Sequence, residues 1–217
     1  MSPAALFAAE AARDALDRYY TPDVVADAFV RWLQVPAGLT VIEPSVGGGA
    51  WARAIRRHAP ACHLTGVDLD PGARGLALCD EAIVGDWTTA DVPQVGLVVG
   101  NPPYGEDAAE HVRRALTVAP VVALLLRETF TQPASYAHLR DPVRRARLER
   151  RSLILDAGLA LQWTWPERIA FGGGSGADSV LHSLLIWRRG HRGPWLREMM
   201  RPDVDGWRPW RTPWEAP

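Results

Sequence analysis

The sequence predicts a doubly wound α/β fold, in which a mostly parallel, seven-stranded sheet lies between helices and ends in an antiparallel C-terminal hairpin. Three observations predict it. Short runs rich in valine, leucine and isoleucine alternate with segments of helical spacing, as in parallel βαβ units. A glycine-rich turn follows the first such run and opens a helix. Late in the chain, two apolar runs flank a second glycine-rich loop, which is typical of a hairpin at a sheet edge.

The first half of the chain supplies the helices and strands in alternation. Residues 3–18 have the composition of a short helix. Thr21-Pro22-Asp23 is a start signal for a second helix, because it combines a hydroxyl cap, a proline at the first helical position and an acid in the first turn. The elements expected next are a strand over Thr40–Glu43, a helix over Ala50–His58, a strand over His63–Asp68, a helix over Pro71–Asp80 and a strand over Ala82–Gly85.

The second half continues this alternation and then changes character. The expected elements are a strand over Val95–Gly100, a helix over Asp107–Val118, a strand over Val121–Leu126, an arginine-rich helix near Asp141–Arg151 and hairpin strands over Leu159–Trp165 and Ser179–Trp187 around a loop at Phe171–Gly176. We therefore expect one domain over residues 1–189, with an arginine-rich insertion over 131–151. A tail rich in proline, arginine and tryptophan follows over 190–217.

Charge and composition limit the classes of function. The net charge of −1 argues against simple electrostatic capture of nucleic acid, but the charges are unevenly spread. Residues 66–110 carry nine acids and one base, whereas residues 127–151 carry seven arginines and three acids. No apolar stretch reaches membrane-spanning length and no secretory pattern opens the chain, so a cytoplasmic protein is expected. Cys62 and Cys79 have no metal-ligand spacing, and no metal is expected.

The glycine-rich turn is the first candidate ligand site. It runs Glu43-Pro44-Ser45-Val46-Gly47-Gly48-Gly49, and its glycines allow a ligand to approach the backbone and the N–H groups of the next helix. Dinucleotide-binding enzymes share such a turn, so the turn alone does not identify the ligand.

Acidic residues close the first three expected strands beside this turn. After Glu43, Asp68 closes the second strand, where a carboxylate can accept hydrogen bonds from ribose hydroxyls. Asp86-Trp87 closes the third strand, where the acid can accept from an adenine amine while the indole packs on the ring. Taken singly, Asp68 and Asp86 fit solvated turn carboxylates equally well. Three acids at successive strand ends beside a glycine turn favour the ligand-binding interpretation.

The most informative segment is Asn101-Pro102-Pro103-Tyr104, which follows an apolar strand. Open α/β sheets bind ligands at this end of their strands. Two consecutive prolines make the backbone stiff and extended, so the Asn101 amide and the Pro102 carbonyl become fixed acceptors beside the flat Tyr104 ring. Two acceptors beside an aromatic face suit a planar amino group, such as the exocyclic amine of adenine or the amide of glutamine. An ordinary proline turn is the alternative.

These motifs together give a resemblance. Glu43-Pro44-x-x-Gly47-x-Gly49, followed by Asn101-Pro102-Pro103-Tyr104, resembles the S-adenosylmethionine-dependent amino-group methyltransferases. Tyr20-Thr21-Pro22 looks like the motif that precedes the glycine turn in one group of adenine-N6 DNA methyltransferases. Arg168–Gly174, with the strand after it, is similar to the tail of small phage and prophage members. The resemblance covers roughly residues 19–187; Ser45 stands where many of these enzymes have glycine, and no separate target-recognition domain is visible.

The resemblance implies a site-specific DNA-methyltransferase that moves a methyl group from S-adenosylmethionine to N6 of an adenine flipped out of DNA. Asn101, Pro102 and Tyr104 are the implied catalytic residues. The base is expected to lie between Tyr104 and Phe171, beside Pro103, although Phe171 also fits a plain loop anchor. The implied cofactor-binding residues are Tyr20, Thr21, Glu43, Ser45, Gly47, Gly49, Asp68, Asp86, Trp87 and Asn101. Thr21 also fits a plain helix cap.

Arginines supply a candidate DNA contact. Arg140, Arg144, Arg147 and Arg151 share one face of the expected helix by 4-3-4 spacing. A solvated, salt-bridged helix face gives the same pattern, whereas the functional interpretation is contact with DNA backbone phosphates. The expected partner is single- or double-stranded DNA and not a membrane, with the protein a monomer or homodimer. The tail tryptophans either stack on bases or pack back on the domain.

Other functions also fit the pocket. An RNA adenine would look the same to it, and glutamine-N5 protein methyltransferases also use an Asn-Pro-Pro-Tyr loop. The Tyr-Thr-Pro element, the late glycine-rich hairpin and the arginine face argue against glutamine. A catalytically silent nucleic-acid-binding subunit is a further alternative, against which the intact loop and glycine turn argue.

Overall fold

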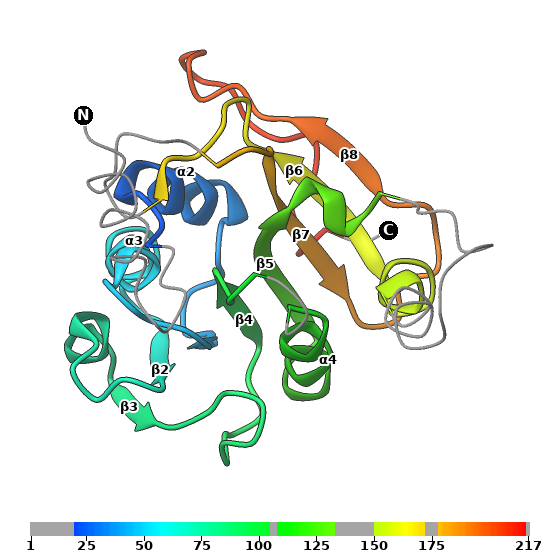
Figure 1. Cartoon of the computed structure of the whole chain (residues 1–217). Coiled ribbons are helices and arrows are strands. Elements are labelled where there is room, and N and C mark those ends of the chain that lie inside the picture. The colour runs from blue at the N-terminus through cyan, green and yellow to red at the C-terminus, as the bar shows by residue number, and fades with distance from the viewer. Residues whose placement is uncertain (1–19, 105–107, 133–149, 172–177, 216–217) are drawn as a thin grey trace, which may run out of the picture.

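A single mixed sheet forms the centre of the computed structural model, which describes residues 20–104, 108–132, 150–171 and 178–215 (Figure 1). Its strand order is β3-β2-β1-β4-β5-β7-β6-β8. The strands are β1 (Thr40–Glu43), β2 (His63–Asp68), β3 (Glu81–Val84), β4 (Leu97–Gly100), β5 (Val121–Arg127), β6 (Leu159–Thr164), β7 (His182–Arg188) and β8 (Leu196–Met199). The five strands from β3 to β5 run parallel. β7 is antiparallel to both β5 and β6, and β8 is parallel to β6.

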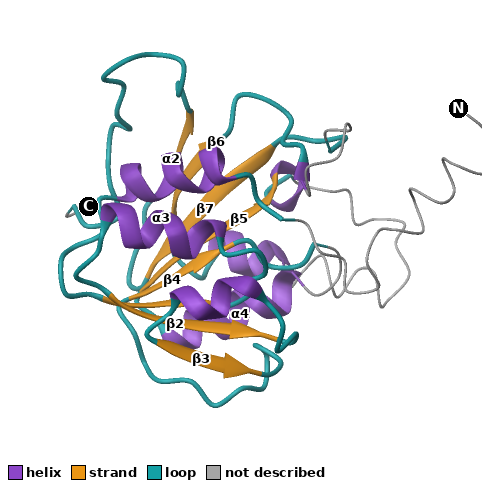
Figure 2. Cartoon of the chain, turned by 90° about the vertical axis from the view of Figure 1, so that its left-hand side faces the viewer, coloured by secondary structure: helices purple, strands orange, loops and turns teal. Residues whose placement is uncertain are grey.

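Helices cover both faces of this sheet. Figure 2 shows α2 (Asp23–Leu33) and α3 (Ala50–His58) side by side on one face, and α4 (Ala108–Val118) packs on the other. Two short 3₁₀ turns, η1 (Arg74–Leu78) and η2 (Glu128–Phe130), join elements.

The central strands β4 and β5 are almost entirely apolar because both of their faces are buried. In β4, Leu97 and Val99 join the core on the α2 and α3 side, whereas Val98 joins the core on the α4 side. Val41 and Ile42 of β1 divide between the two cores in the same way. Alternate side chains of a strand point to opposite faces, so a sheet covered twice needs continuous apolar runs. The predicted doubly wound, mostly parallel fold with an antiparallel C-terminal hairpin is therefore confirmed.

Three details differ from the prediction. The expected helix over Pro71–Asp80 is only the short turn η1, because Gly75 lies against the glycine-rich turn: its N–H donates to the Gly47 carbonyl, and a Cβ on it would come within 2.1 Å of Val46. The Thr21 hydroxyl is not the cap of α2, whose N-cap residue is Pro22 without a side-chain hydrogen bond. The second hairpin strand begins at His182 instead of Ser179.

The tail adds an eighth strand that the seven-strand prediction lacked. β8 pairs with β6, and an ion pair between Arg197 and Glu128 joins it to the end of β5. Beyond β8, the Trp207 ring meets Trp32 of α2 with 4.9 Å between centroids, and the Trp214 indole donates to the Leu33 carbonyl over 2.6 Å. These two tryptophans pack back on the domain, whereas Trp210 is 87% exposed. Four residues without β-branching gave β8 little strand signal.

The expected helix over residues 3–18 and most of the arginine-rich stretch lie outside the described residues. In the described part of the chain, no helix has the length and apolar character needed to cross a bilayer. The order of the strands changes side between β1 and β4. From β1 the chain adds β2 and then β3 on one side, and β4 then pairs with the other side of β1. Open α/β sheets bind their ligands at such a switch point.

Candidate active site

A cavity of about 460 Å³ lies at this switch point. Its walls come from the segment that opens α2, the glycine-rich turn with the start of α3, η1 and the end of β4. Seven of the predicted cofactor residues line it together: Tyr20, Thr21, Glu43, Ser45, Gly47, Gly49 and Asn101. The fold therefore gathers side chains that lie up to 81 positions apart in the sequence, from Tyr20 to Asn101, around one space.

The glycines of the turn are required by conformation and by space. Gly47 and Gly49 have φ values of 48° and 82°, in the left-handed region. A Cβ on Gly47 would lie 3.0 Å from the Tyr20 ring, and one on Gly49 would lie 2.7 Å from the Cα of Gly75. Gly49 is also the N-cap residue of α3, whose first residues line the cavity. The turn thus presents bare backbone and a helix N-terminus to a ligand.

Glu43 contributes a buried carboxyl group to the cavity. Its side chain is 0% exposed, and in the described part of the chain neither carboxyl oxygen has a partner at hydrogen-bond geometry. Burial raises its pKa well above the ordinary value, and the Asp68 charge raises it further; the Ala52 backbone amide and the Arg53 charge offset this only in part. A buried polar group without partners is costly, so a ligand that supplies hydrogen-bond donors here would relieve that cost.

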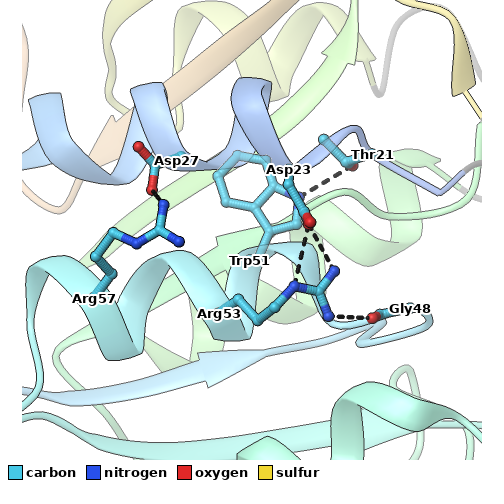
Figure 3. A network of polar contacts seen from close by, with 7 residues as sticks. All are labelled: Thr21, Asp23, Asp27, Gly48, Trp51, Arg53 and Arg57. Carbon is cyan, nitrogen blue, oxygen red and sulfur yellow. Dashed lines mark hydrogen bonds and ion pairs between the residues drawn. The ribbon is translucent and has the colours of Figure 1, made fainter.

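Polar contacts fix α2 against the glycine-rich turn (Figure 3). Arg53 of α3 donates to Asp23 Oδ1 over 2.6 Å from Nη2 and to the Gly48 carbonyl over 2.8 Å. The Trp51 indole donates to the Thr21 hydroxyl over 3.2 Å. Thr21 is therefore held in place by α3, with its own hydroxyl proton left to donate. Sequence reasoning missed Arg53, because its partner Asp23 lies 30 residues away and no local pattern links them.

Three predicted cofactor residues do not line the cavity. Asp68 Oδ2 accepts from the Gly47 N–H over 2.7 Å and its Oδ1 accepts from the Asp70 N–H, so this carboxylate supports the turn. Asp86 accepts from the backbone N–H and the hydroxyl of Thr88, which lowers its pKa. Trp87 differs most from the prediction: only 2% exposed, it packs in the core on the α4 side, and its indole donates to the His111 carbonyl.

One apolar residue at this end of the sheet was missed. Leu69 follows Asp68 directly after β2 and is 59% exposed. A sequence signal existed, since Leu69 stands between Asp68 and Asp70 at a strand end. It supplies an apolar face next to the carboxylate that supports the turn.

The Asn101–Tyr104 corner follows β4, as predicted. Asn101 lines the cavity, while Pro102 and Tyr104 are buried. The Tyr104 and Phe171 rings meet edge to face, with centroids 5.7 Å apart and an angle of 72°. A base between two stacked rings needs two gaps of about 3.5 Å each. The expected placement of adenine between Tyr104 and Phe171 therefore requires one of the rings to move.

Behind these rings lies a cluster that the sequence did not indicate. His182 of β7 contacts both rings, the Arg127 guanidinium lies 5.3 Å from the Tyr104 ring centroid, and Asp178 bonds to Arg127 over 3.1 Å. Burial lowers the pKa of His182 to about 4; the Asp178 charge opposes this shift and the Arg127 charge adds to it. Burial alone would raise the pKa of Asp178, but Arg127, the Ser179 N–H and His182 hold it below its usual value.

Most of the predicted DNA-contacting face lies outside the described residues, namely Arg140, Arg144 and Arg147. Arg151 is exposed on a helical turn over residues 150–155. Beside it, the Arg150 guanidinium lies 5.2 Å from the ring centroid of Phe130, which anchors this turn to the sheet end.

Comparisons with solved structures support the fold assignment. The methyltransferase subunit of a type I restriction-modification system from Streptococcus thermophilus superposes with a TM-score of 0.60 at 15% identity, covering 80% of this chain and 45% of that one. The M protein of the type I restriction enzyme EcoKI gives 0.62 at 16% identity, covering 88% and 48%. A putative RNA methyltransferase from Pyrococcus horikoshii gives 0.58 at 16% identity, covering 80% and 87%. The chain has the Rossmann-like fold that these methyltransferases share.

One curated relative matches by sequence. A release factor glutamine methyltransferase from Mycolicibacterium smegmatis is 30% identical over 105 residues, covering 42% of this chain and 37% of the relative. The chain thus spans little more than a third of that relative and less than half of the two restriction subunits. No family model matches the sequence.

Proposed function

We propose that this protein transfers a methyl group from S-adenosylmethionine to the exocyclic N6 amine of adenine in DNA. The single observation that carries the proposal is the meeting of two features at one switch point: a glycine-lined cavity with the buried Glu43 carboxyl, and Asn101 of the Asn-Pro-Pro-Tyr corner on its wall. The first feature suits a charged, amine-bearing cofactor, and the second suits a planar amino acceptor.

The residues present fit S-adenosylmethionine. Its methionyl end carries hydrogen-bond donors, and among the described residues the Glu43 carboxyl has no such partner. The bare backbone at Gly47–Gly49 allows the cofactor to approach closely. Thr21 and the adjoining start of α2 are proposed for the same end of the cofactor, with Tyr20 over the turn. When bound, the cofactor supplies an electrophilic methyl group on a sulfonium, so the protein has no need of a strong base.

For the acceptor, the task of the protein is positioning. We propose that the Asn101 amide oxygen and the Pro102 carbonyl accept the two amine hydrogens. These bonds favour a nitrogen whose lone pair has left the ring system, and they strengthen as the methyl bond forms. Holding the amine and the methyl carbon in line in a site without water supplies much of the rate. Tyr104 would offer the stacking face that offsets the cost of base flipping.

DNA is preferred over other acceptors for three reasons. The Tyr20-Thr21-Pro22 segment lies beside the glycine-rich turn, as the DNA-enzyme resemblance implies. The arginine-rich stretch, most of which lies outside the described residues, has the composition expected of a phosphate-contacting segment. Two of the structural neighbours are subunits of DNA restriction-modification systems. The proposal includes a catalytic domain over residues 1–189 and backbone contacts from Arg140, Arg144, Arg147 and Arg151.

The proposal is tested with Asn101→Ala. Purified protein is incubated with methyl-labelled cofactor and DNA, and the nucleosides are then separated and identified by mass. We expect N6-methyladenine from the wild type and a loss of at least about 100-fold in the variant. Cofactor affinity, measured by calorimetry, is expected to change little. Near-normal turnover in Asn101→Ala would remove this residue from catalysis.

A second candidate is methylation of a glutamine side chain in a protein. It is favoured by the 30% identity to a release factor glutamine methyltransferase, and the planar amide of glutamine fits the same two acceptors. Incubating the protein in parallel with DNA, RNA and a glutamine-bearing release-factor domain separates the candidates, because only the correct acceptor takes up label.

A further inference from the structure

The acceptor corner rests on a buried cluster to which the proposed reaction assigns no task. His182 of β7 is 0% exposed, and its ring centroid lies 5.1 Å from that of Tyr104 and 4.8 Å from that of Phe171. The three rings contact one another in pairs, so the buried His182 ring supports both the Tyr104 ring and the Phe171 ring.

Arg127, at the end of β5, makes further contacts with this group of rings. The Arg127 guanidinium lies over the Tyr104 ring at 5.3 Å, and its Nε donates to Asp178 Oδ2 over 3.1 Å. The same carboxylate oxygen lies 3.4 Å from His182 Nε2. Asp178 therefore lies between the cation over Tyr104 and the imidazole beside it, and the tyrosine ring has contacts on several sides.

This arrangement matters when an acceptor base arrives. Because Tyr104 is only 8% exposed and its ring contacts that of Phe171, a base that stacks on Tyr104 has to displace part of this contact. Once Phe171 has moved aside, His182 and Arg127 are the contacts that hold the Tyr104 ring in its place. A tyrosine without them could tilt into the space behind, and the stacked amine would leave the line of transfer.

We propose that His182, braced by the Arg127–Asp178 pair, is a positioning residue that sets the tilt and depth of the Tyr104 ring. The role needs an uncharged ring of this size. Burial keeps the imidazole neutral at physiological pH, and the charged or titratable groups that face it are Asp178, Arg127 and the Tyr104 phenol. The inference rests on the proposed function only for the identity of the stacked base.

The test combines a reaction rate with a chemical probe of Tyr104. We compare His182→Ala with wild type for kcat and KM on adenine-containing DNA, and for nitration by tetranitromethane mapped by mass spectrometry. We expect Tyr104, 8% exposed in the wild type, to become several-fold more reactive. We expect kcat/KM to fall about 10-fold while the dissociation constant of S-adenosylmethionine stays unchanged. Nitration of Tyr20, which lies on the cofactor side, serves as the internal control.

Two further variants separate positioning from general destabilisation. His182→Phe keeps a neutral ring of similar size and is expected to restore both readouts. Arg127→Met removes the cation but keeps most of the stem, and is expected to raise Tyr104 nitration by a smaller factor; it carries the test if His182→Ala does not fold. Wild-type nitration and kcat/KM in His182→Ala, or wild-type nitration in Arg127→Met, would overturn the inference. If the wild type methylates no adenine while Tyr104 nitration follows the predicted order, the positioning role stands and the proposed acceptor is wrong.

Discussion

The two halves of the site are prepared differently. On the cofactor side, a cavity of about 460 Å³ lies over the glycine-rich turn. Glu43 is buried in its wall, and no described residue meets either of its carboxyl oxygens at hydrogen-bond geometry. On the acceptor side, the Tyr104, Phe171 and His182 rings fill the space against one another. Under the proposed function, the cofactor would enter a cavity that is already present, whereas an acceptor base would have to displace the contact between Tyr104 and Phe171.

Each half of the site contains one buried titratable group, Glu43 on the cofactor side and His182 on the acceptor side. Burial raises the pKa of Glu43 and lowers that of His182, so in each case burial disfavours the charged form. The free energy of unfolding therefore falls at Glu43 as pH rises and falls at His182 as pH drops. This difference allows each half of the site to be tested separately, without knowledge of the acceptor.

The largest effect is expected from Gly49→Ala on the cofactor side. The new Cβ would meet the Gly75 backbone at 2.7 Å at a position with φ of 82°, so we expect a loss of about 2–3 kcal/mol of unfolding free energy and of most cofactor binding. Gly38→Ala is the matched control, because Gly38 has φ of 75° but nothing within 4 Å. Chemical denaturation and calorimetry measure both; equal losses in the two variants would mean that the close approach is unimportant.

The next effect is the acid sensitivity of the acceptor side. The folded pKa of His182 is about 4 against 6.5 in its ordinary state, so the unfolded chain binds the extra proton first as pH falls. His182 should cost a growing amount of stability from pH 6.5 down to 4, up to about 3 kcal/mol. Asp178 does not contribute in that window, since its stabilisation is lost only below its ordinary pKa of 3.8. Denaturation at pH 4.5 and 7 should show a smaller pH slope in His182→Phe; parallel slopes would contradict this.

A smaller effect of opposite sign is expected at Glu43. Its folded pKa lies well above 4.5, so the unfolded chain loses its proton first as pH rises, and stability falls above pH 4.5. Glu43→Gln should remove this decline and weaken S-adenosylmethionine binding about 10-fold, since an amide replaces the carboxyl that we propose to contact the cofactor. Thermal melts from pH 5 to 8 and calorimetry check both. A variant with the wild-type decline would show that the Glu43 carboxyl is not held neutral.

The smallest expected effect is a difference in cofactor affinity between variants of two arginines of α3, Arg53 and Arg57. Arg53 reaches the cavity wall through Asp23 and Gly48, whereas Arg57 pairs with Asp27 one turn further on (Figure 3). Arg53→Met should weaken cofactor binding about fivefold, because Arg53 lines the cavity and holds the Gly48 carbonyl of the turn. Arg57→Met should leave cofactor binding unchanged, because Arg57 is not among the residues that line the cavity. Similar affinities in the two variants would remove Arg53 from the cofactor site.

Local signals predicted the fold, and seven of the residues they singled out for the cofactor line one cavity. Strand–helix alternation, the glycine-rich turn and the Asn101–Tyr104 corner are contiguous, so periodicity and turn chemistry revealed them. The acceptor-side cluster was missed because its members meet only through the antiparallel pairing of β5 and β7: Arg127 lies opposite His182 in that register. Trp87 was misplaced because a sequence cannot show which face of the sheet an indole at a strand end will cover.

The central claim is that the open cavity and the Asn101 corner act together on an adenine amine. The most direct measurement is mass analysis of nucleosides after incubating wild type and Asn101→Ala with labelled S-adenosylmethionine and DNA. We expect labelled N6-methyladenine from the wild type alone, with both proteins binding the cofactor. Cofactor binding without N6-methyladenine from the wild type, or equal yields from both proteins, would contradict it.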